Sequence, residues 1–220
     1  MYSQNIQFVE KNDTLEKPKY QQFIYITENT SLVKSKQVAK IKVTGSLKDV
    51  ANLFLTIKRE AQKIGANSFK FESFNKIDSE NWELILTTYY NEDDFFDDNF
   101  KNIPKNKVYV FGNQNLLENR SQGYKVNGEK FEIESGKFKE FEIKVGEELK
   151  INKGGFTGMS LWITGKEEGY CSFISFSGIG IVGAGFNPRG GGGINITTGS
   201  INRIEPNMGF ALLKIFSAIQ

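Results

Sequence analysis

The glycine-rich stretch near the carboxy terminus is the first segment whose residue types point to ligand binding. It runs from Phe186 through Pro188 and Arg189 into four consecutive glycines. Successive glycine amides can converge on an anion, and an arginine adds a fixed positive charge. The alternative is a flexible hairpin tip, because glycine runs maximise backbone freedom. We predict a ligand-binding loop formed by Asn187, Arg189, Gly190, Gly191, Gly192 and Gly193.

An earlier glycine pattern, from Gly178 through Gly180 to Gly183, has the spacing of a dinucleotide-binding loop. Such a loop opens a helix, and an acidic residue further along the chain binds the ribose. Here Pro188 and further glycines follow instead, and no aspartate occurs after Asp98. The pattern therefore favours glycine-kinked strands, and we predict no cofactor.

A group of aspartates near the middle of the chain has the residue type that binds Ca²⁺. These secondary candidates for a metal site are Asp93, Asp94, Asp97 and Asp98. The spacing lacks the glycine and the final glutamate of an EF-hand loop. We therefore interpret the segment as a solvated acidic turn or short helix, and we predict no metal.

The composition removes most nucleophilic chemistry. The chain has no histidine and a single cysteine, Cys171, which excludes histidine-based triads, Cys-His pairs, histidine-ligated metals and intrachain disulfides. Cys171 lies in an apolar run over 170–174, which predicts a buried, inert thiol. We assign no catalytic residue. The enzyme alternative is a hydrolase that uses two glutamates of the second domain in one cleft.

The aromatic residues offer a stacking surface. Trp82, Trp162 and the nineteen phenylalanines could form a platform for sugars or bases. Aromatic residues at alternating strand positions more often fill a core, where their burial stabilises the fold most. We therefore expect them in the core.

The charge balance bears on partners. With 28 basic and 26 acidic residues, the formal net charge of +2 gives no strong electrostatic footprint for nucleic acid. The most apolar run, Phe173 to Phe186, is too short and too glycine-rich for a transmembrane helix. We predict no nucleic-acid partner and no transmembrane segment.

Glycine and aspartate divide the chain into two parts. Only Gly45 and Gly65 precede Gly112, and the other glycines run from there to Gly209. Residues 1–19 are polar without periodicity and predict a tail. We predict an α+β domain over 20–112, a polar linker over 113–122 and an antiparallel β-sandwich over 123–220. The strand-like run 108–111 could close the first domain or open the second.

The first domain has the pattern β-β-α-β-β. Short β-rich runs over 22–26 and 38–43 predict two strands. Apolar residues then recur at spacings of three and four after Ser46, a candidate N-cap, which predicts a helix that Gly65 ends. Two further strands are predicted over 68–74 and 82–90.

The second domain is predicted to be all-β and antiparallel. Asn127-Gly128 lies between two alternating runs, which is the strongest short hairpin signal. Turn residues recur every eight to twelve positions, which indicates a sandwich or barrel of roughly seven to nine strands. The later strands are predicted over 141–145, 160–164, 170–176, 194–197 and 209–216.

The end of the predicted helix and the strand after it resemble a known junction. Residues 60–67 (Glu-Ala-Gln-Lys-Ile-Gly-Ala-Asn), followed by Ser68 to Phe71, resemble the Ala-x-x-x-Gly-Ala-Asn junction of the Rcs stress-sensor lipoprotein and the YbjQ-like heavy-metal-binding family. The resemblance covers 38–90 and implies a non-catalytic, oligomeric envelope module. The cysteines of the stress sensor and any metal-binding histidine are absent here, so neither disulfides nor metal binding carry over.

The amino terminus bears on location. Met1 to Asn5 resemble the end of a flavobacterial secretion signal, and cleavage of such a signal often leaves glutamine at the mature amino terminus. We predict a periplasmic, outer-membrane-associated or secreted protein, with a cytoplasmic protein as the alternative. Its predicted function is non-catalytic binding of a protein or glycan partner, and a homo-oligomer is left open. A further alternative is a structural protein that docks the 173–186 hairpin on a membrane or partner.

Overall fold

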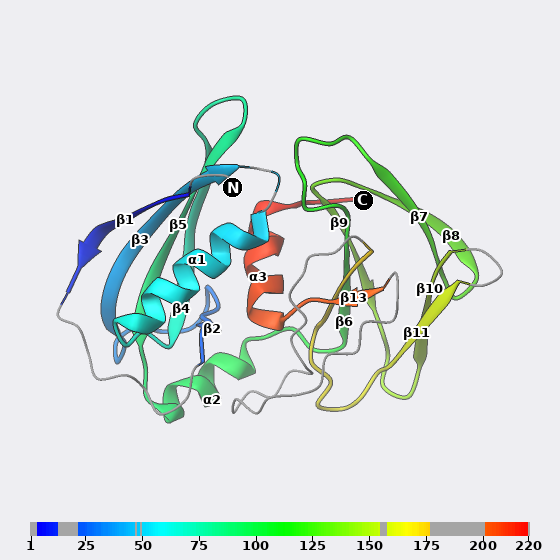
Figure 1. Ribbon diagram of the computed structural model, residues 1–220. Coiled ribbons are helices and arrows are strands. Elements are labelled where there is room, and N and C mark those ends of the chain that lie inside the picture. Colours follow the sequence, from blue (N-terminus) through cyan, green and yellow to red (C-terminus); the bar gives the residue numbers. More distant parts are fainter. Residues whose placement is uncertain are drawn as a thin grey trace. The chain divides into compact units, whose positions relative to one another are not determined.

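The computed structural model describes residues 4–12, 22–46, 48, 50–154, 158–176 and 201–219. These residues form two compact units, one ending at Ile103 and the other beginning at Pro104 (Figure 1). The described fold is mixed α and β and rich in sheet, with three helices and three sheets. The run 108–111, which could have belonged to either predicted domain, forms strand β6 of the second unit.

The first unit is built on a five-stranded sheet with the strand order β1-β3-β5-β4-β2. Neighbouring strands are antiparallel, except that β2 joins β4 in parallel. Its strands are β1 (Asn5–Lys11), β2 (Ile24–Tyr25), β3 (Lys36–Ser46), β4 (Ser68–Lys76) and β5 (Asn81–Tyr90). The strands predicted within 22–90 are therefore present.

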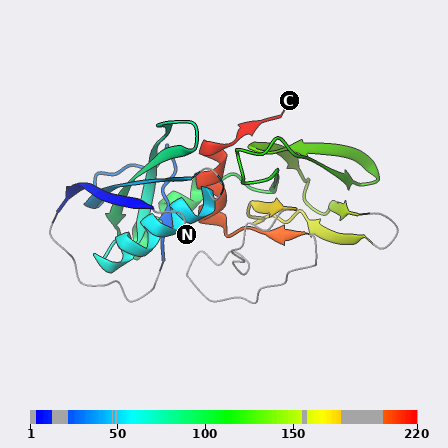
Figure 2. The same ribbon diagram turned by 45° about the horizontal axis from the view of Figure 1, so that its top comes forward.

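Helix α1 (Val50–Lys63) connects β3 to β4 and lies across one face of this sheet (Figures 1 and 2). Its apolar stripe is buried, and the ring of Phe54 meets that of Phe69 on β4 edge-on, with the centroids 5.2 Å apart. The helix ends where predicted, because Gly65 adopts a φ of 91°, which favours glycine.

The predicted polar tail is wrong for Asn5–Lys11, which forms β1. Ile6 and Phe8 lie opposite Val43 and Ile41 of β3 and are half-buried. Two apolar residues at alternating positions were sufficient for a strand, because the paired edge of β3 supplies the backbone partners.

Helix α2 (Asp93–Lys101) follows β5 and closes the first unit. Its buried Asn99 accepts hydrogen bonds from the Thr27 amide and the Thr30 hydroxyl, both at 2.9 Å. The Asn99 amide group also donates to the Tyr25 carbonyl at 2.8 Å. One polar side chain thus connects α2 to β2 and to the loop after it.

The second unit contains two sheets. The four-stranded sheet has the order β11-β10-β7-β8, and the five-stranded sheet has the order β13-β12-β6-β9-β14. The former comprises β7 (Ser121–Val126), β8 (Glu129–Glu134), β10 (Glu148–Lys153) and β11 (Met159–Thr164). The latter comprises β6 (Lys107–Phe111), β9 (Lys137–Glu142), β12 (Ser172–Ser175), β13 (Asn202–Arg203) and β14 (Ser217–Ala218).

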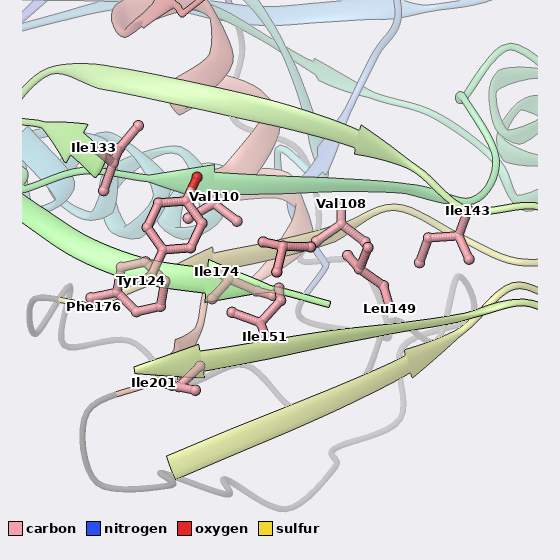
Figure 3. Close-up of a cluster of buried hydrophobic side chains, with 11 residues drawn as sticks. Val108, Val110, Tyr124, Ile133, Ile143, Leu149, Ile151, Ile174, Phe176 and Ile201 are labelled. Atoms are coloured by element: carbon pink, nitrogen blue, oxygen red, sulfur yellow. The ribbon is translucent and has the colours of Figure 1, made fainter. Parts of the chain in front are cut away.

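Side chains from both sheets form one hydrophobic core. Tyr124 and Ile151 of the four-stranded sheet belong to the same buried cluster as Val108, Val110 and Ile174 of the five-stranded sheet. Figure 3 shows these side chains between the strands. In the four-stranded sheet, buried residues alternate with exposed ones along β7 and β10, which defines an inner and an outer face for that sheet. In the five-stranded sheet, β6 and β12 carry consecutive buried residues, so both faces of these two strands are covered.

The predicted Asn127-Gly128 hairpin is confirmed. These two residues connect β7 to β8 and have φ values of 50° and 90°, which fit a two-residue turn of the I′ type. The stretch 113–122, predicted as a linker, lies within the second unit. It is hydrogen-bonded there to the turn after β8, through Ser135 to the Arg120 carbonyl and through Gly136 to the Asn113 carbonyl.

The prediction of an all-β, antiparallel second domain is wrong in two respects. Residues 209–216, predicted as a strand, lie largely in helix α3 (Pro206–Ile215), and β12 and β14 pair in parallel with β6 and β9. The Glu205 carboxylate caps the helix by accepting from the amides of Asn207 and Met208 at 3.2 and 3.0 Å. The cap and Pro206 at the first helical position outweigh the strand-like apolar run.

Candidate functional site

The residues of the predicted ligand-binding loop lie outside the described residues. They are Asn187, Arg189, Gly190, Gly191, Gly192 and Gly193. The pattern 178–183 and the predicted strand 194–197 also lie there.

The aspartate group lies on the first and second turns of α2, with its carboxylates exposed. Asp98 forms an ion pair with Lys101 at 2.7 Å, and the hydrogen bond from that ammonium lowers the pKa of Asp98. Asp94 lies 3.7 Å from the Lys34 ammonium. Across the residues that the structure describes, no group of three or more acidic or cysteine side chains is placed to hold a metal ion.

Cys171 is buried, as predicted. Its thiol donates to the Pro104 carbonyl at 3.0 Å, and burial raises its pKa to about 12. A thiol held in its neutral form is a poor nucleophile, so this residue has a packing role.

The two tryptophans have different surroundings. Trp82 of β5 stacks on Phe74 with the ring centroids 4.6 Å apart, and it is half-buried. Trp162 of β11 is 51% exposed, so the expectation that it fills the core is wrong. Its neighbours Leu161 and Ile163 pack against the core instead, because alternate strand residues point to opposite faces.

Trp162 lies on the outer face of the four-stranded sheet. Buried residues alternate with outward ones along β7 and β10, where Tyr124, Val126 and Ile151 point into the core. We call the opposite side the outer face. Besides Trp162, Ser160 and Thr164, it carries Ser121, Gly123, Lys125, Lys130, Glu132, Glu134, Glu148, Lys150 and Asn152.

The strand register arranges these side chains in rows. Asn152 lies opposite Lys125 of β7 and Ser160 of β11, and Lys125 lies opposite Lys130 of β8. The Asn152 amide donates a hydrogen bond to the Ser160 hydroxyl. In the neighbouring row, Gly123 lies opposite Glu132. The row of polar side chains formed by Lys130, Lys125, Asn152 and Ser160 therefore lies beside a second row that contains Glu132 and Gly123.

A shallow pocket of about 310 Å³ lies at these two rows. Its lining residues are Gly123, Tyr124, Lys125, Lys130, Phe131, Glu132, Asn152 and Gly154. A Cβ on Gly123 would meet nothing nearer than the Phe131 carbonyl oxygen at 4.0 Å, so the missing side chain leaves open space. We call this hollow the glycine pocket. Backbone forms its floor, and Lys125, Lys130 and Glu132 surround it.

The charged side chains that line the glycine pocket are two lysines and one glutamate. In the described part of the chain, neither Lys125 nor Lys130 lies within ion-pair distance of a carboxylate. Glu132 accepts a hydrogen bond from the Ser121 hydroxyl at 3.2 Å. The Lys150 ammonium lies 5.2 Å from the ring centroid of Trp162, a cation–π geometry.

Lys153 supports the pocket floor from the core side. Its ammonium lies 5.0 Å from the ring centroid of Phe176 and donates to the Gly123 carbonyl at 2.8 Å. Burial lowers the pKa of Lys153. The hydrogen bond fixes the Gly123 backbone at the floor.

The chemistry that this arrangement supports is binding. Glu132 is the single carboxylate on the pocket, and no glutamate is buried anywhere in the described ranges. The pair of buried glutamates that would favour a hydrolase is therefore not found there. Ammonium, carboxylate, amide and indole groups together are suited to hold a polar ligand against the sheet.

Sequence reasoning did not single out the glycine pocket, although one signal was present. Gly123 interrupts an otherwise regular strand, and a glycine inside a strand often marks the close approach of a ligand. The alternation of buried Tyr124 with exposed Lys125 also places Gly123 on the polar side of the strand. The partner strand β10, which supplies Asn152, could not be read from the chain, because β10 and β7 are not consecutive.

Comparison of the chain with protein-family models, curated proteins and solved structures finds no match. The resemblance of 38–90 to envelope modules therefore stays a prediction. None of the helices in the described ranges has the length and apolar character needed to cross a bilayer.

Proposed function

We propose that this chain is a non-catalytic binding protein whose ligand lies on the outer face of the four-stranded sheet. The observation that carries the proposal is the glycine pocket, where open space is lined by one carboxylate and by two ammonium groups that form no ion pair with any described residue. Such convergence of polar groups around a preformed hollow is typical of ligand sites.

The exposed indole of Trp162 supports the choice of this face. Among the described residues of the second unit, most aromatic side chains are buried, for example Tyr109, Phe111 and Phe173. A half-exposed indole leaves apolar area in water that a ligand can cover, and tryptophan is among the residues that contribute most to binding.

A cell-envelope or secreted location forms part of the proposal. It is supported by the resemblance of 38–90 to envelope modules and of Met1 to Asn5 to the end of a secretion signal. A glycan or protein partner and a homo-oligomer fit that setting. The alternative of an apolar hairpin docked on a membrane draws no support from the described part of 173–186, because Phe173 and Ile174 are buried.

Amide chemical-shift mapping tests the proposed surface. The ¹⁵N-labelled protein is titrated with neutral polysaccharides, acidic polysaccharides, a single-stranded oligothymidylate and inorganic phosphate. The proposal expects at least one probe to shift the amides of Gly123, Lys125 and Asn152 more than those of the five-stranded sheet. Shifts confined to other surfaces, or no shift with any probe, would contradict it.

A further inference from the structure

The distance between Trp162 and the glycine pocket sets the size of the ligand. Trp162 pairs with Lys150, and Gly154 on the pocket lies four residues further along the same stretch of chain. Four residues span about 13 Å, and β11 and β7 are separated by two strand spacings, about 10 Å. The diagonal is roughly 16 Å. A ligand that touches both must therefore be an extended chain.

The groups that line the glycine pocket, together with those between it and Trp162, recognise hydroxyls and anions. Glu132 can accept hydrogen bonds from hydroxyl groups, and Asn152 and Ser160 can both donate and accept. Lys125 and Lys130 donate only, and each favours a negatively charged partner. The face therefore fits a ligand that carries many hydroxyls and some negative charges.

The flat indole and the glycine floor favour a ring with a C–H face. A pyranose presents C–H groups on one side, which can cover an indole, while its hydroxyls point outward to the neighbouring polar side chains. At Gly123 no side chain stands above the backbone, so a ring can approach the sheet closely.

We propose that the outer face binds an acidic polysaccharide, a chain of pyranose rings that carries carboxylate or sulfate groups. One ring stacks on Trp162, and an anionic ring lies in the glycine pocket between Lys125 and Lys130. This inference rests on the proposed function, because it names the ligand class of the same surface.

Single-stranded nucleic acid is the competing ligand class, since bases also stack on tryptophan. The observations favour the glycan. The hydroxyl groups of a polysaccharide can donate to Glu132, whereas a single-stranded DNA backbone presents a phosphate at every nucleotide and few donors.

The test compares polygalacturonate with the same polymer in which methyl esterification removes the negative charge of the carboxylates. Alginate, chondroitin sulfate, a neutral glucan and an oligothymidylate complete the set, and calorimetry measures each affinity. The inference expects at least one acidic polymer to bind and, for a uronate, esterification to weaken binding roughly tenfold or more.

Three single variants test the site residues: Trp162→Ala, Lys125→Ala and Lys130→Ala. The matched control is Lys144→Ala, which changes an exposed lysine away from the pocket. Lys125→Ala and Lys130→Ala should each lower the affinity for the acidic polymer roughly tenfold. Each should also reduce the difference in affinity between the charged and the esterified polymer. Trp162→Ala should lower the affinity for every polysaccharide that binds the parent protein. Lys144→Ala should leave each affinity unchanged.

The outcomes separate this inference from the proposed function. Equal affinity for the charged and the esterified polymer, or binding of the neutral glucan alone, would contradict the proposal of an acidic ligand. The proposal that the outer face is the binding surface would stand. Tighter binding of the oligothymidylate, lost in Trp162→Ala, would also overturn the glycan and keep the surface. If no probe binds, or if the variants of Trp162, Lys125 and Lys130 bind with the affinity of the parent protein, both proposals fail.

Discussion

At the scale of single residues, the glycine pocket depends on the absence of one side chain. Gly123 is a strand residue whose backbone does not need glycine, in contrast to Gly154, which has a φ of 97°. Gly123 therefore does not serve the backbone, and the open space above it is available to a ligand.

Gly123→Val should close the pocket without unfolding the protein. The new Cβ enters open space and valine favours strands, so the free energy of unfolding should stay equal or rise by about 0.5–1 kcal/mol. Urea unfolding measures the change. The matched variant Gly154→Ala should lose about 1 kcal/mol, because its φ is left-handed and its Cβ would lie 3.0 Å from the Gly158 Cα. Equal losses for the two would refute this reading of Gly123.

Asn99→Ala should destabilise the first unit by about 2–4 kcal/mol, because it leaves the Thr27 amide and the Tyr25 carbonyl without their buried partner. Asp97→Ala, an exposed change on the same helix, should alter the free energy of unfolding by less than about 0.5 kcal/mol. Chemical denaturation of both variants checks the difference. A loss in Asn99→Ala no larger than in Asp97→Ala would show that this network contributes little.

Cys171 should make the second unit sensitive to alkali. Burial raises the pKa of its thiol from 9.0 to about 12, so the folded state favours the neutral form. The associated stability is present below pH 9 and is lost as the pH rises from there towards 12. Cys171→Ala should therefore show a shallower loss of stability over this window than the parent protein. Unfolding measured at several pH values gives both slopes, and identical slopes would contradict the assignment.

At the scale of secondary-structure elements, the residues at the amino-terminal end of α3 determine that a helix forms there. The apolar run over 209–216 suits either a strand or a helix, and Glu205 with Pro206 selects the helix. Helix α3 then brings Gly209 against Phe173, where a Cβ would lie 2.3 Å from the ring. Close packing at Gly209 thus fixes the helix on its sheet.

Glu205→Ala should lower the free energy of unfolding by about 1 kcal/mol, because two helix amides lose their acceptor. Glu205→Ser should restore most of the loss, since a serine hydroxyl can cap the same amides. Thermal unfolding compares the two variants. A serine variant as unstable as the alanine variant would show that the carboxylate acts through another contact.

The elements show which parts of the fold could be predicted. The helix α1 and the hairpin at Asn127-Gly128 followed from local spacing and turn chemistry alone. Strand β1 and helix α3 did not, because the first depends on pairing with β3 and the second on a cap that competes with an apolar run. The glycine pocket belongs with the latter, since Asn152 and Lys125 meet only through the pairing of β10 with β7.

At the scale of the whole molecule, the chain combines two units with different roles. The first is held by α1 and by the Asn99 network, and the second carries the outer face. With a net charge of +2 and one carboxylate beside the pocket, binding to an acidic polysaccharide should weaken moderately with salt. Specificity would then depend on the indole and the hydroxyl-binding groups as much as on charge.

The most direct measurement is the affinity of the parent protein and of Gly123→Val for the same acidic polysaccharide, with the free energy of unfolding measured alongside. We expect the variant to be at least as stable as the parent and to bind at least tenfold more weakly, because its side chain occupies the pocket. Unchanged affinity in a stably folded Gly123→Val variant would contradict the claim that this pocket is the binding site.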